Sequence, residues 1–448
     1  MFVVLSGFRL RAQACALAAL LSLNFFSLKV IANQDLLTQN LQDKVLVSEI
    51  DIRGLSRTKK YVVLRELIFK TGDQLSTDIL LESIQRVKNT ELFSEVSPFI
   101  ERLPNNTAKI IIRVKEKWTA IPYMNYSSGG GTEQLTAGFY DINIAGRFIQ
   151  SGVQYDNWNG EHSGSIWLQN PRMFNKRVAT SVSYFSIKKP KSLYLDSGVK
   201  TGSYVLARNL FKLSLEKKYE SGFSSGTAIE LYEDAFIAYD SNEMLDKQTL
   251  LQISDSNKSR AKLYSFSAKY GRTDYDNFLF SGGESGLTFK HSMLTKNTEE
   301  SFYHFVFLNR YYKRLPHSGN LALQARLGVT NTQQLQHQFL VGGFQHVRGY
   351  FDGQFRGGAY WQLNAEYRIP SYRHKLAIFQ HNFFVDVTEV KNDYTELTFD
   401  KDSIKLSAGL GIRIIIPWIY RSVGRLDYAV FRGSSQSSRI ALGVKQFF

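Results

Sequence analysis

The feature that most limits how this chain can fold is an alternation of apolar and polar residues that runs from residue 119 to the end. In residues 359–368, the odd positions are all apolar or aromatic, and most of the even positions are polar or charged. Residues 404–414 repeat this pattern, with glycine at two of the polar positions. Since successive side chains of a β-strand point to opposite faces, this spacing predicts strands with one apolar and one polar face.

The length of the alternating region favours a transmembrane barrel over a soluble sandwich, although both show such strands. At about ten residues for each tilted membrane strand plus turns, residues 119–448 have room for about sixteen strands. The composition agrees, with 14% aromatic residues, 32 glycines and only 8 prolines. We therefore predict a mainly β protein, a transmembrane antiparallel β-barrel, with strands least defined between residues 188 and 260.

The first 32 residues have the order of a secretory signal peptide. Arg9 and Arg11 precede an apolar run over residues 12–26, and small or tolerated residues at 30–32 offer a cleavage site. A membrane-anchoring helix is the alternative, but the run is shorter than the roughly 20 residues that a span needs. No apolar run of that length follows residue 33. The single cysteine, Cys15, lies in the apolar run, which argues against a disulfide scaffold.

Residues 45–117 predict a small α+β unit in the order β-α-α-β-β. An alternating strand over 45–52 ends at Gly54, and Thr58 is a candidate cap for a first helix. A second helix starts at Thr77 or Asp78 and carries apolar residues at helical spacing. Two strands, 93–100 and 109–114, follow with a turn at residues 104–106.

This unit resembles a POTRA domain, the periplasmic repeat of outer-membrane assembly and secretion proteins. The resemblance is carried by short segments along the whole unit: Ile52-Arg53-Gly54, Arg65-Glu66-Leu67, Lys70-Thr71-Gly72-Asp73, Ser83-Ile84-Gln85-Arg86 and Leu92-Phe93. Only one copy is present. The resemblance implies a periplasmic domain in front of the barrel.

The C-terminal segment 439–448 alternates and ends on the aromatic residue Phe448, with Gly443 five residues before it. It resembles the C-terminal signal by which outer-membrane barrels are recognised for insertion. That signal prefers an apolar residue at the position of Gln446, so the match is incomplete. The resemblance implies that Gly443 and Phe448 belong to an insertion signal.

Residues 342–350 contain the most informative motif of the chain, Val347-Arg348-Gly349-Tyr350. It resembles the sixth outer loop of the BamA/TamA superfamily, which includes two-partner secretion transporters. In that family the loop folds into the lumen, and its arginine meets acidic residues on the next two wall strands. The resemblance places this role on Glu366 and Asp386. Thr388 departs from the glycine of the family pattern.

The alternation gives independent support to this pairing. Glu366 lies on the polar face of its strand, and Asp386 shares a face with Phe384, opposite Val385 and Val387. Carboxylates that face a lumen favour a cation, and a planar guanidinium can bind a carboxylate through two hydrogen bonds. The alternative is that Arg348 is solvated in a loop while both acids are hydrated in the pore.

Other chemistry has weaker support. Residues 222–226 fit G-x-S-x-G, but a strand pattern follows them where an esterase needs a helix. The eight histidines have no metal-ligand spacing, so we expect neither an enzyme nor a metal or other cofactor. The formal net charge is +15, or 52 − 40 = +12 without residues 1–32. The basic residues are scattered, which favours lipid or lipopolysaccharide over nucleic acid as the anionic counterpart.

Three functions remain open at this point. The family resemblance implies an outer-membrane factor that assists insertion of other barrels, by pairing their strands at the seam between its first and last strands and at the POTRA edge. A polypeptide-secretion pore is the alternative, although such transporters normally carry two POTRA domains. A passive channel is the third possibility, but it would need neither a POTRA unit nor the Val-Arg-Gly-Tyr loop. Unfolded outer-membrane or secreted polypeptides, and periplasmic or lipoprotein factors, are the expected partners, in the outer membrane of a Gram-negative cell.

Overall fold

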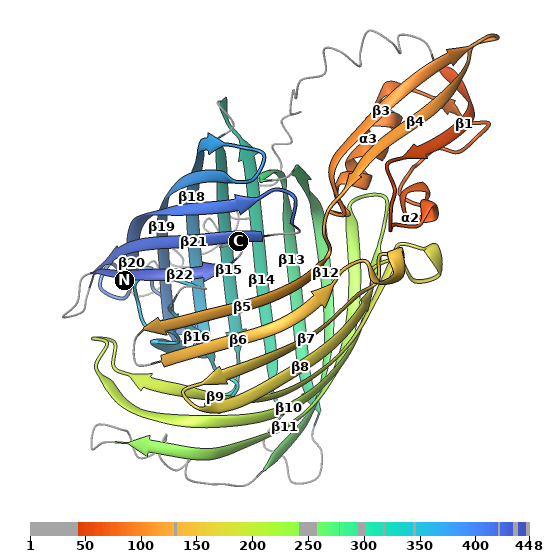
Figure 1. Cartoon of the computed structure of the whole chain (residues 1–448). Coiled ribbons are helices and arrows are strands. Elements are labelled where there is room, and N and C mark those ends of the chain that lie inside the picture. Colours follow the sequence, from red (N-terminus) through yellow and green to blue (C-terminus); the bar gives the residue numbers. More distant parts are fainter. Residues whose placement is uncertain are drawn as a thin grey trace, which may run out of the picture.

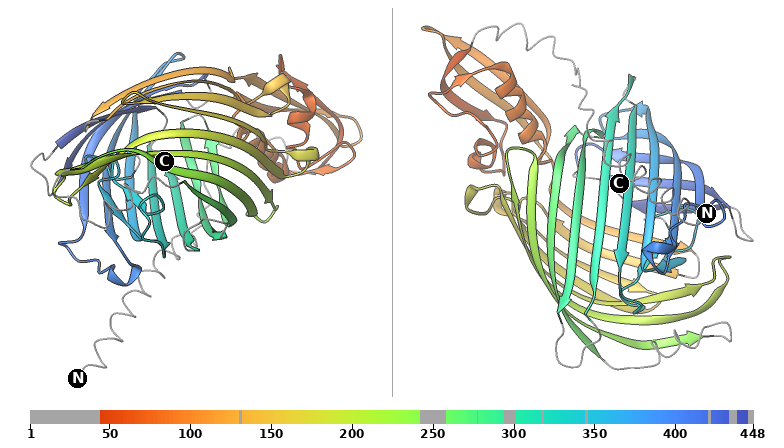
Figure 2. Two further views of the ribbon diagram at one scale, coloured as in Figure 1. Left: turned by 90° about the horizontal axis from the view of Figure 1, so that it is seen from below. Right: turned by 180° about the vertical axis from the view of Figure 1, so that it is seen from behind.

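The protein consists of a sixteen-stranded antiparallel sheet curled into a barrel and a small α+β unit at one rim, as Figures 1 and 2 show. This computed structural model describes residues 44–129, 132–241, 258–276, 278–293, 301–316, 319–343, 346–419, 422–432 and 438–444. The expected signal peptide and Phe448 lie outside these residues. Within them, no helix is long and apolar enough to cross a membrane.

The barrel strands follow one another in sequence around the wall, with each strand antiparallel to its neighbours. The prediction of about sixteen strands is therefore confirmed. The strands are β5 (Ala120–Gly129), β6 (Thr132–Asp141), β7 (Gln150–Trp158), β8 (Glu161–Asn170), β9 (Val178–Tyr194), β10 (Lys200–Lys218), β11 (Phe223–Ser241), β12 (Ser259–Asp276), β13 (Leu279–Met293), β14 (Tyr303–Arg314), β15 (Asn320–Thr330), β18 (Ala359–Arg373), β19 (Ile378–Lys391), β20 (Lys405–Ile416), β21 (Ser422–Phe431) and β22 (Ser438–Val444).

The region that the sequence defined least, residues 188–260, lies mainly in the longest strands. β9, β10 and β11 have 17, 19 and 19 residues, well beyond the ten or so that a tilted membrane strand needs. A register shift between Val205 and Leu206, and apolar residues of the outer ends that pack on Leu335 of the β15–β18 loop, interrupt the period-two pattern there. Figure 1 shows these strands curving beyond the rest of the wall.

The barrel has its apolar face outside and its polar face inside. On β20, Leu406, Leu410 and Ile414 are exposed, whereas Ser407 and Arg413 between them are buried. The same division holds on β19, where Val385 is exposed and Asp386 is inaccessible to solvent. A soluble protein would bury such a continuous apolar surface, so this surface is the one that faces lipid.

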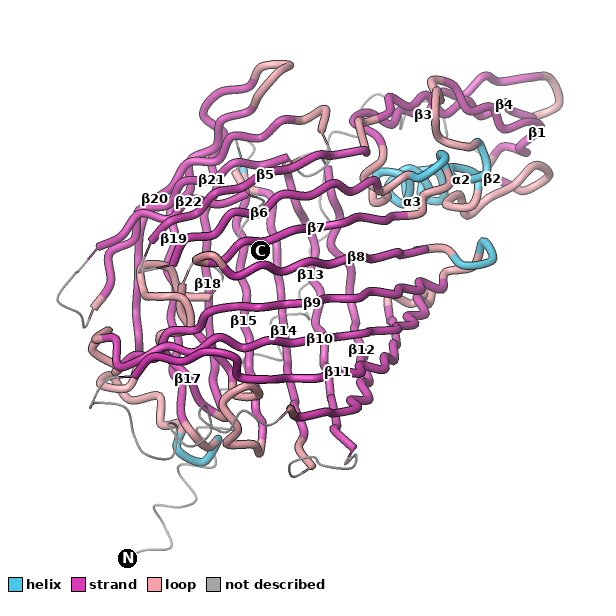
Figure 3. Tube along the Cα trace, turned by 60° about the horizontal axis from the view of Figure 1, so that its bottom comes forward, coloured by secondary structure: helices cyan, strands magenta, loops and turns pink. Residues whose placement is uncertain are grey.

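The α+β unit is a four-stranded sheet with both helices on one face, as the secondary-structure colours of Figure 3 show. Its sheet order is β2-β1-β4-β3, which leaves β3 as a free edge. Valine, leucine and isoleucine from strands and helices form its core. Its elements are β1 (Val45–Arg53), α2 (Lys60–Leu64), β2 (Gln74–Leu75), α3 (Thr77–Lys88), β3 (Phe93–Leu103) and β4 (Thr107–Glu116).

Two details of this unit differ from the sequence prediction. Thr58 is not a helix cap: α2 begins after Lys59, which makes no side-chain cap, and the Thr58 hydroxyl instead accepts a hydrogen bond from Asn143 of the barrel at 2.8 Å. The first helix is therefore shorter than expected. The strand β2 was not anticipated, because its two residues are too few for a period to appear.

Candidate functional site

The loop between β15 and β18 folds back into the barrel and carries the Val-Arg-Gly-Tyr motif. It contains a two-stranded hairpin, β16 (Phe339–Val341) and β17 (Phe355–Gly357). The motif lies between these strands, and its side chains are buried against β18 to β21. Among the outer loops it is the sixth, because the β5–β6 connection is the first.

Arg348 lies against both predicted carboxylates. Its Nε and Nη2 donate to the two oxygens of Asp386 at 2.7 and 2.8 Å, and its backbone N–H donates to Asp386 at 3.1 Å. Its Nη1 donates to Glu366. The guanidinium also lies 3.5 Å over the Phe384 ring. These contacts use the planar fork of arginine and a cation–π contact, which lysine could not reproduce.

The pair belongs to a larger buried ion network. Arg413 donates to Asp427 at 2.6 Å and to Glu366 at 3.3 Å, while Arg368 pairs with Glu366 at 2.7 Å. Asp427 also lies 3.6 Å from Arg348. Three cations thus face three anions, and all six side chains are at most 1% exposed: Arg348, Arg368, Arg413, Glu366, Asp386 and Asp427. A fourth cation, Arg425, lies 4.0 Å from Asp427 at the border of this network. The pairing of opposite charges is what allows so many of them to be buried.

Glycines create the space that the motif occupies. Gly349 has φ of +93°, and a Cβ there would lie 2.6 Å from the ring of Phe431. On the facing wall, a Cβ at Gly411 would lie 2.1 Å from an oxygen of Asp427, and one at Gly409 would lie 2.5 Å from Phe384. The alternation of β20 put both glycines on the lumen face, where they leave room for the ion network.

Val347 and Tyr350 anchor the motif on either side of Arg348. Val347 is fully buried in an apolar cluster with Phe355 and Phe431. The Tyr350 hydroxyl donates to the carbonyl of Arg432 at 2.8 Å and lies 3.1 Å from that of Leu406. The motif therefore joins the main chains of β20 and β21. We name Val347, Arg348, Gly349 and Tyr350 together with Glu366, Asp386 and Asp427 the loop lock.

Thr388, the departure from the family pattern, has a local role in the wall. Its hydroxyl donates to the carbonyl of Trp361 on β18 at 2.6 Å, and it is fully buried. The bond adds a side-chain link between β18 and β19 close to the strands that hold the lock. The extra atoms of threonine are therefore accommodated without disturbing Asp386.

The seam of the barrel lies between β5 and β22, the two ends of the sixteen-stranded sheet. Every other pair of neighbours has an extended register, whereas none joins β5 to β22 among the residues that the structure describes. Just before β5, the Trp118 N–H donates to the carbonyl of Trp418, in the turn between β20 and β21, at 3.3 Å. The segment that leads into β5 therefore contacts the turn between β20 and β21.

Gly443 lies on β22 beside the last members of the charged wall. A Cβ at this position would lie 2.7 Å from Nε of Arg425, so glycine provides the room for that arginine. Arg425 in turn lies 4.0 Å from Asp427 of the loop lock. The structure does not describe Phe448, so the insertion signal remains a sequence prediction.

The α+β unit contacts three turns at the adjoining rim of the barrel. Arg172, between β8 and β9, makes two hydrogen bonds to the carboxylate of Glu66, at 2.7 and 2.8 Å. Arg272 near the β12–β13 turn donates to Glu82 on α3 at 2.6 Å. The third contact is the Asn143 bond to Thr58, from the β6–β7 turn.

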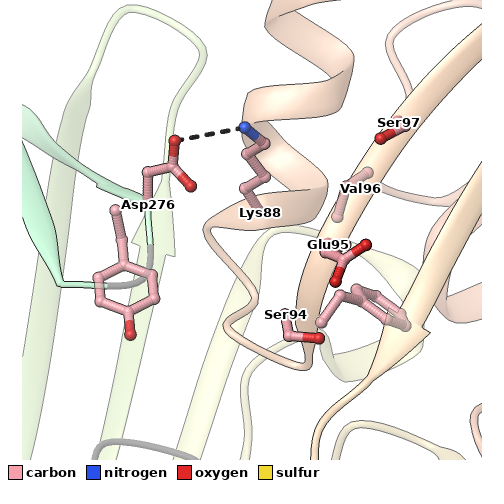
Figure 4. Close-up of a pocket in the computed structure, with 8 residues that line it drawn as sticks. Lys88, Ser94, Glu95, Val96, Ser97 and Asp276 are labelled. Carbon is pink, nitrogen blue, oxygen red and sulfur yellow. Dashed lines mark ion pairs between the residues drawn. The ribbon is translucent and has the colours of Figure 1, made fainter. Parts of the chain in front are cut away.

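A cavity of about 210 Å³ lies where the free edge of the small unit faces the barrel rim, as Figure 4 shows. Ser94, Glu95 and Ser97 of β3 line one side, and Asp276 lines the other. An ion pair of 3.5 Å between Lys88 and Asp276 crosses it. The start of an unpaired strand edge therefore faces an open space next to the barrel.

Comparison with known proteins agrees with this architecture. The Omp85 superfamily domain matches residues 143–448, more than half of the chain. This chain belongs to the Omp85 superfamily. A second family model, the POTRA domain described as a surface antigen variable number repeat, matches residues 45–117. The family resemblance expected from the sequence is therefore confirmed.

Individual relatives are distant. The outer membrane protein assembly factor BamA of Neorickettsia risticii is 26% identical over 162 residues, which are 35% of this chain and 22% of that protein. This chain thus aligns with less than a quarter of that relative's length.

Three solved structures share the fold of this Omp85 member. BamA from Haemophilus ducreyi lacking POTRA domains 1–3 has 17% identity and a TM-score of 0.54, with 89% of this chain and 83% of that chain covered. CdiB from Acinetobacter baumannii has 13% identity and a TM-score of 0.57, with 90% and 74% covered. CdiB from Escherichia coli has 12% identity and a TM-score of 0.54, with 93% and 92% covered.

Several charged residues of this Omp85 barrel were not predicted from the sequence, although the structure places them beside the predicted ones. Asp427, Arg413 and Arg368 complete the ion network around Arg348. All three alternate with apolar neighbours, so their place on the lumen face was readable from the sequence. The alternation does not give the register between strands, and this register decides whether two residues that face the lumen come into contact.

Proposed function

We propose that this protein assists the insertion of outer-membrane proteins by offering the edges of its seam, β5 and β22, to the strands of an incoming barrel. The observation that carries the proposal is the seam itself, because a strand with an unpaired edge is a template for another strand. β22 pairs with β21 on one side only within the described residues. Membership of the Omp85 superfamily and the likeness to BamA support this function.

The POTRA unit would act as a second, periplasmic template. β3 is an edge strand, and the first part of it faces the cavity at the barrel rim. An extended polypeptide that added to this edge would pair through its main chain, which is independent of sequence and suits many different substrates. We infer that the barrel resides in the outer membrane with the POTRA unit in the periplasm, where lipoprotein factors could join it.

Reconstitution tests the main proposal. The purified protein in phosphatidylcholine vesicles should accelerate the folding of an added, urea-unfolded outer-membrane barrel, followed by the shift of the folded form on a gel without heating. A variant with a disulfide between the facing ends of β5 and β22 should lose the acceleration and regain it on reduction. Equal rates with and without protein would contradict the proposal.

A polypeptide-secretion pore is the second candidate, favoured by the likeness to CdiB over 90% or more of this chain. A pore needs a lumen that opens, so it predicts ion conductance that increases when the loop lock is removed. It also predicts that deletion removes one exported polypeptide from the medium. Deletion that lowers many outer-membrane proteins at once would instead favour the insertion function.

We also propose a lipopolysaccharide contact on the outer wall. Three basic residues occupy alternate positions just before and at the start of β12, Lys258, Arg260 and Lys262, and the exposed Tyr264 and Phe266 follow them. Glu233 of β11 binds the first two at 3.1 and 2.7 Å. Basic residues at the outer edge of the lipid-facing surface are well placed to contact the phosphates of a glycolipid in the outer leaflet.

Binding of diphosphoryl lipid A tests this contact. The double variant Arg260→Gln/Lys262→Gln should bind it about 30-fold more weakly than the wild type, since each charge near such a surface contributes about 1 kcal/mol. The control Lys176→Gln/Lys375→Gln removes two exposed charges at periplasmic turns and should bind as the wild type does. Equal loss in both variants would indicate a general charge effect.

A further inference from the structure

The ring of Phe351, directly after the loop lock, lies between two groups from opposite sides of the barrel. On one face it stacks on Tyr194, the last residue of β9, with ring centroids 4.7 Å apart and planes 5° apart. On the other face the guanidinium carbon of Arg439 lies 3.4 Å from the ring centroid. Arg439 is the second residue of β22, at the outer end of the seam.

The turn between β9 and β10 supports this arrangement by reaching across the mouth of the barrel. The carbonyl of Asp196 accepts a hydrogen bond from Gln354 of the loop at 3.2 Å. Its carboxylate pairs with Lys405 of β20 at 2.9 Å. Lys189 of β9 also lies 3.5 Å from the carboxylate of Asp352. The sixth loop is thus held between the tall wall of β9 and β10 and the strands next to the seam.

In the part of the chain that the structure describes, the outer end of β22 has few other contacts. Within the described residues its backbone ladder joins it to β21 alone, and this ladder begins at Ser438 opposite Val430. Ile440 on the outer face is 69% exposed, so it packs on little. The side chain of Arg439 points the other way, over Phe351 and, at 5.3 Å, over the ring of Phe431. These ring contacts are what join this end of the strand to the loop.

We propose that Phe351 is a positioning residue through which the sixth loop holds the outer end of β22, so that this end of the seam is released when the loop moves. The inference rests on the proposed role of the seam in strand pairing. Arg439 supplies the cation, Phe351 the aromatic face, and Tyr194 the fixed wall against which the ring is pressed. Loop position and seam state are then coupled through one ring.

Hydrogen exchange of β22 tests this coupling without any substrate. In the full chain refolded into phosphatidylcholine vesicles, we expect Phe351→Ala and Arg439→Gln each to speed amide exchange in residues 438–444 by about tenfold, the size of a partly shielded cation–π contact. The double variant should exchange no faster than either single variant, because both remove the same contact. Phe351→Leu, which keeps an apolar side chain but loses the π face, guards against a folding defect in Phe351→Ala.

Phe339→Ala provides the matched control. Phe339 belongs to the same loop and packs on Tyr360, with ring centroids 5.0 Å apart, and not on β22. Exchange in residues 438–444 should therefore stay as in the wild type. Arg439→Lys keeps a cation and should fall between the wild type and Arg439→Gln.

The outcomes separate this inference from the proposed function. Unchanged exchange in Phe351→Leu and Arg439→Gln, or effects that add in the double variant, would overturn the coupling. If the coupling is observed but the wild-type protein does not accelerate barrel folding, the coupling stands and the insertion function fails. If the protein accelerates barrel folding but the variants leave hydrogen exchange unchanged, the insertion function stands and Phe351 does not control the seam.

Discussion

At the scale of single residues, the loop lock is a balanced group of buried charges rather than a single ion pair. Arg348 binds Asp386 through two side-chain hydrogen bonds, and Glu366 is shared among three arginines. In such a network the removal of one charge leaves its partners buried without compensation. The energetic effect of a substitution therefore depends more on the charges that remain than on the bond that is lost.

Replacement of Arg348 tests this view directly. Arg348→Ala should lower the free energy of unfolding by about 3–5 kcal/mol, because two carboxylates stay behind in the lumen. Urea unfolding in vesicles, followed by tryptophan fluorescence, measures the change. Arg147→Ala, at an exposed arginine of the β6–β7 turn, serves as the control and should stay within about 0.5 kcal/mol of the wild type. A similar small effect for Arg348→Ala would show that the network is not a major source of stability.

Glu116 predicts a pH dependence at the junction of the POTRA unit with the barrel. Burial by itself would raise the pKa of this carboxyl, but hydrogen bonds from Thr58, Ser56 and Arg57 lower it below its ordinary 4.5. A lowered pKa in the folded state gives stability that is present above pH 4.5 and is lost as the pH falls through the folded value.

Acid titration of wild type and variant measures this contribution. Between pH 6 and pH 3 the wild type should lose protection of residues 56–58 against hydrogen exchange, after correction for the intrinsic rate. Glu116→Gln should begin with lower protection and change less over the same range. Parallel curves for the two proteins would exclude Glu116 as the titrating group.

At the scale of elements, the contacts between the POTRA unit and the rim determine how firmly the two parts are joined. The carboxylate of Glu66 is 4% exposed and accepts hydrogen bonds from Nε and Nη2 of Arg172. In contrast, Lys88 and Asp276 are partly exposed, and their charged groups are 3.5 Å apart. Exposed ion pairs contribute little, while a shielded bidentate pair contributes more. We therefore expect Glu66 to be the main attachment and Lys88 a minor one.

Spin-label distances test the attachment. With labels at Lys115 on β4 and Lys375 on a periplasmic turn, Glu66→Gln should broaden the distance distribution, because the carboxylate that fixes the α2 end is gone. Lys88→Gln, which removes a weaker pair at the same rim, should leave the distribution nearly unchanged. Equal broadening in both variants would mean that no single contact dominates.

The sequence predicted the elements better than the contacts between them. Alternation revealed the strands from β12 to β22 because each has one lipid face, but it was weak in β9 to β11, where the outer ends carry a buried apolar cluster and a register shift. The pairing of Arg348 with Glu366 and Asp386 was expected through family resemblance, since spacing alone favoured a solvated arginine. Asp427 and the glycines at 409 and 411 needed the register of β20 against β21, which depends on the whole wall. The attachment of Glu66 to Arg172 joins residues 106 positions apart and left no local pattern.

At the scale of the whole molecule, the two ends of the seam are held in different ways. The outer end of β22 is held by side chains of the sixth loop, through Phe351 and Arg439. At the other end, the main chain just before β5 is bonded to the β20–β21 turn, through the Trp118 N–H and the Trp418 carbonyl. The sixth loop can move away from β22, whereas the bonded Trp118 is only two residues from β5 in the chain and stays close to that strand.

A proline substitution separates the main-chain bond from the tryptophan side chain. Trp118→Pro removes the donor, and Trp118→Ala keeps it while losing the same ring. We expect more frequent openings in planar-bilayer conductance for Trp118→Pro than for Trp118→Ala. Identical conductance in the two variants would show that the bond has no part in closing the seam.

The bond between Trp118 and the β20–β21 turn also gives the proposed opening of the seam a direction. With Trp118 held at this end, the edges of the proposed seam would part first at the end next to the sixth loop. An incoming substrate hairpin would then meet unpaired backbone first at the outer end of the seam. It would extend its pairing toward the other end, displacing native contacts one residue pair after another. Growth of a new barrel on this template would thus proceed from outside to inside, against the direction from which its chain arrives.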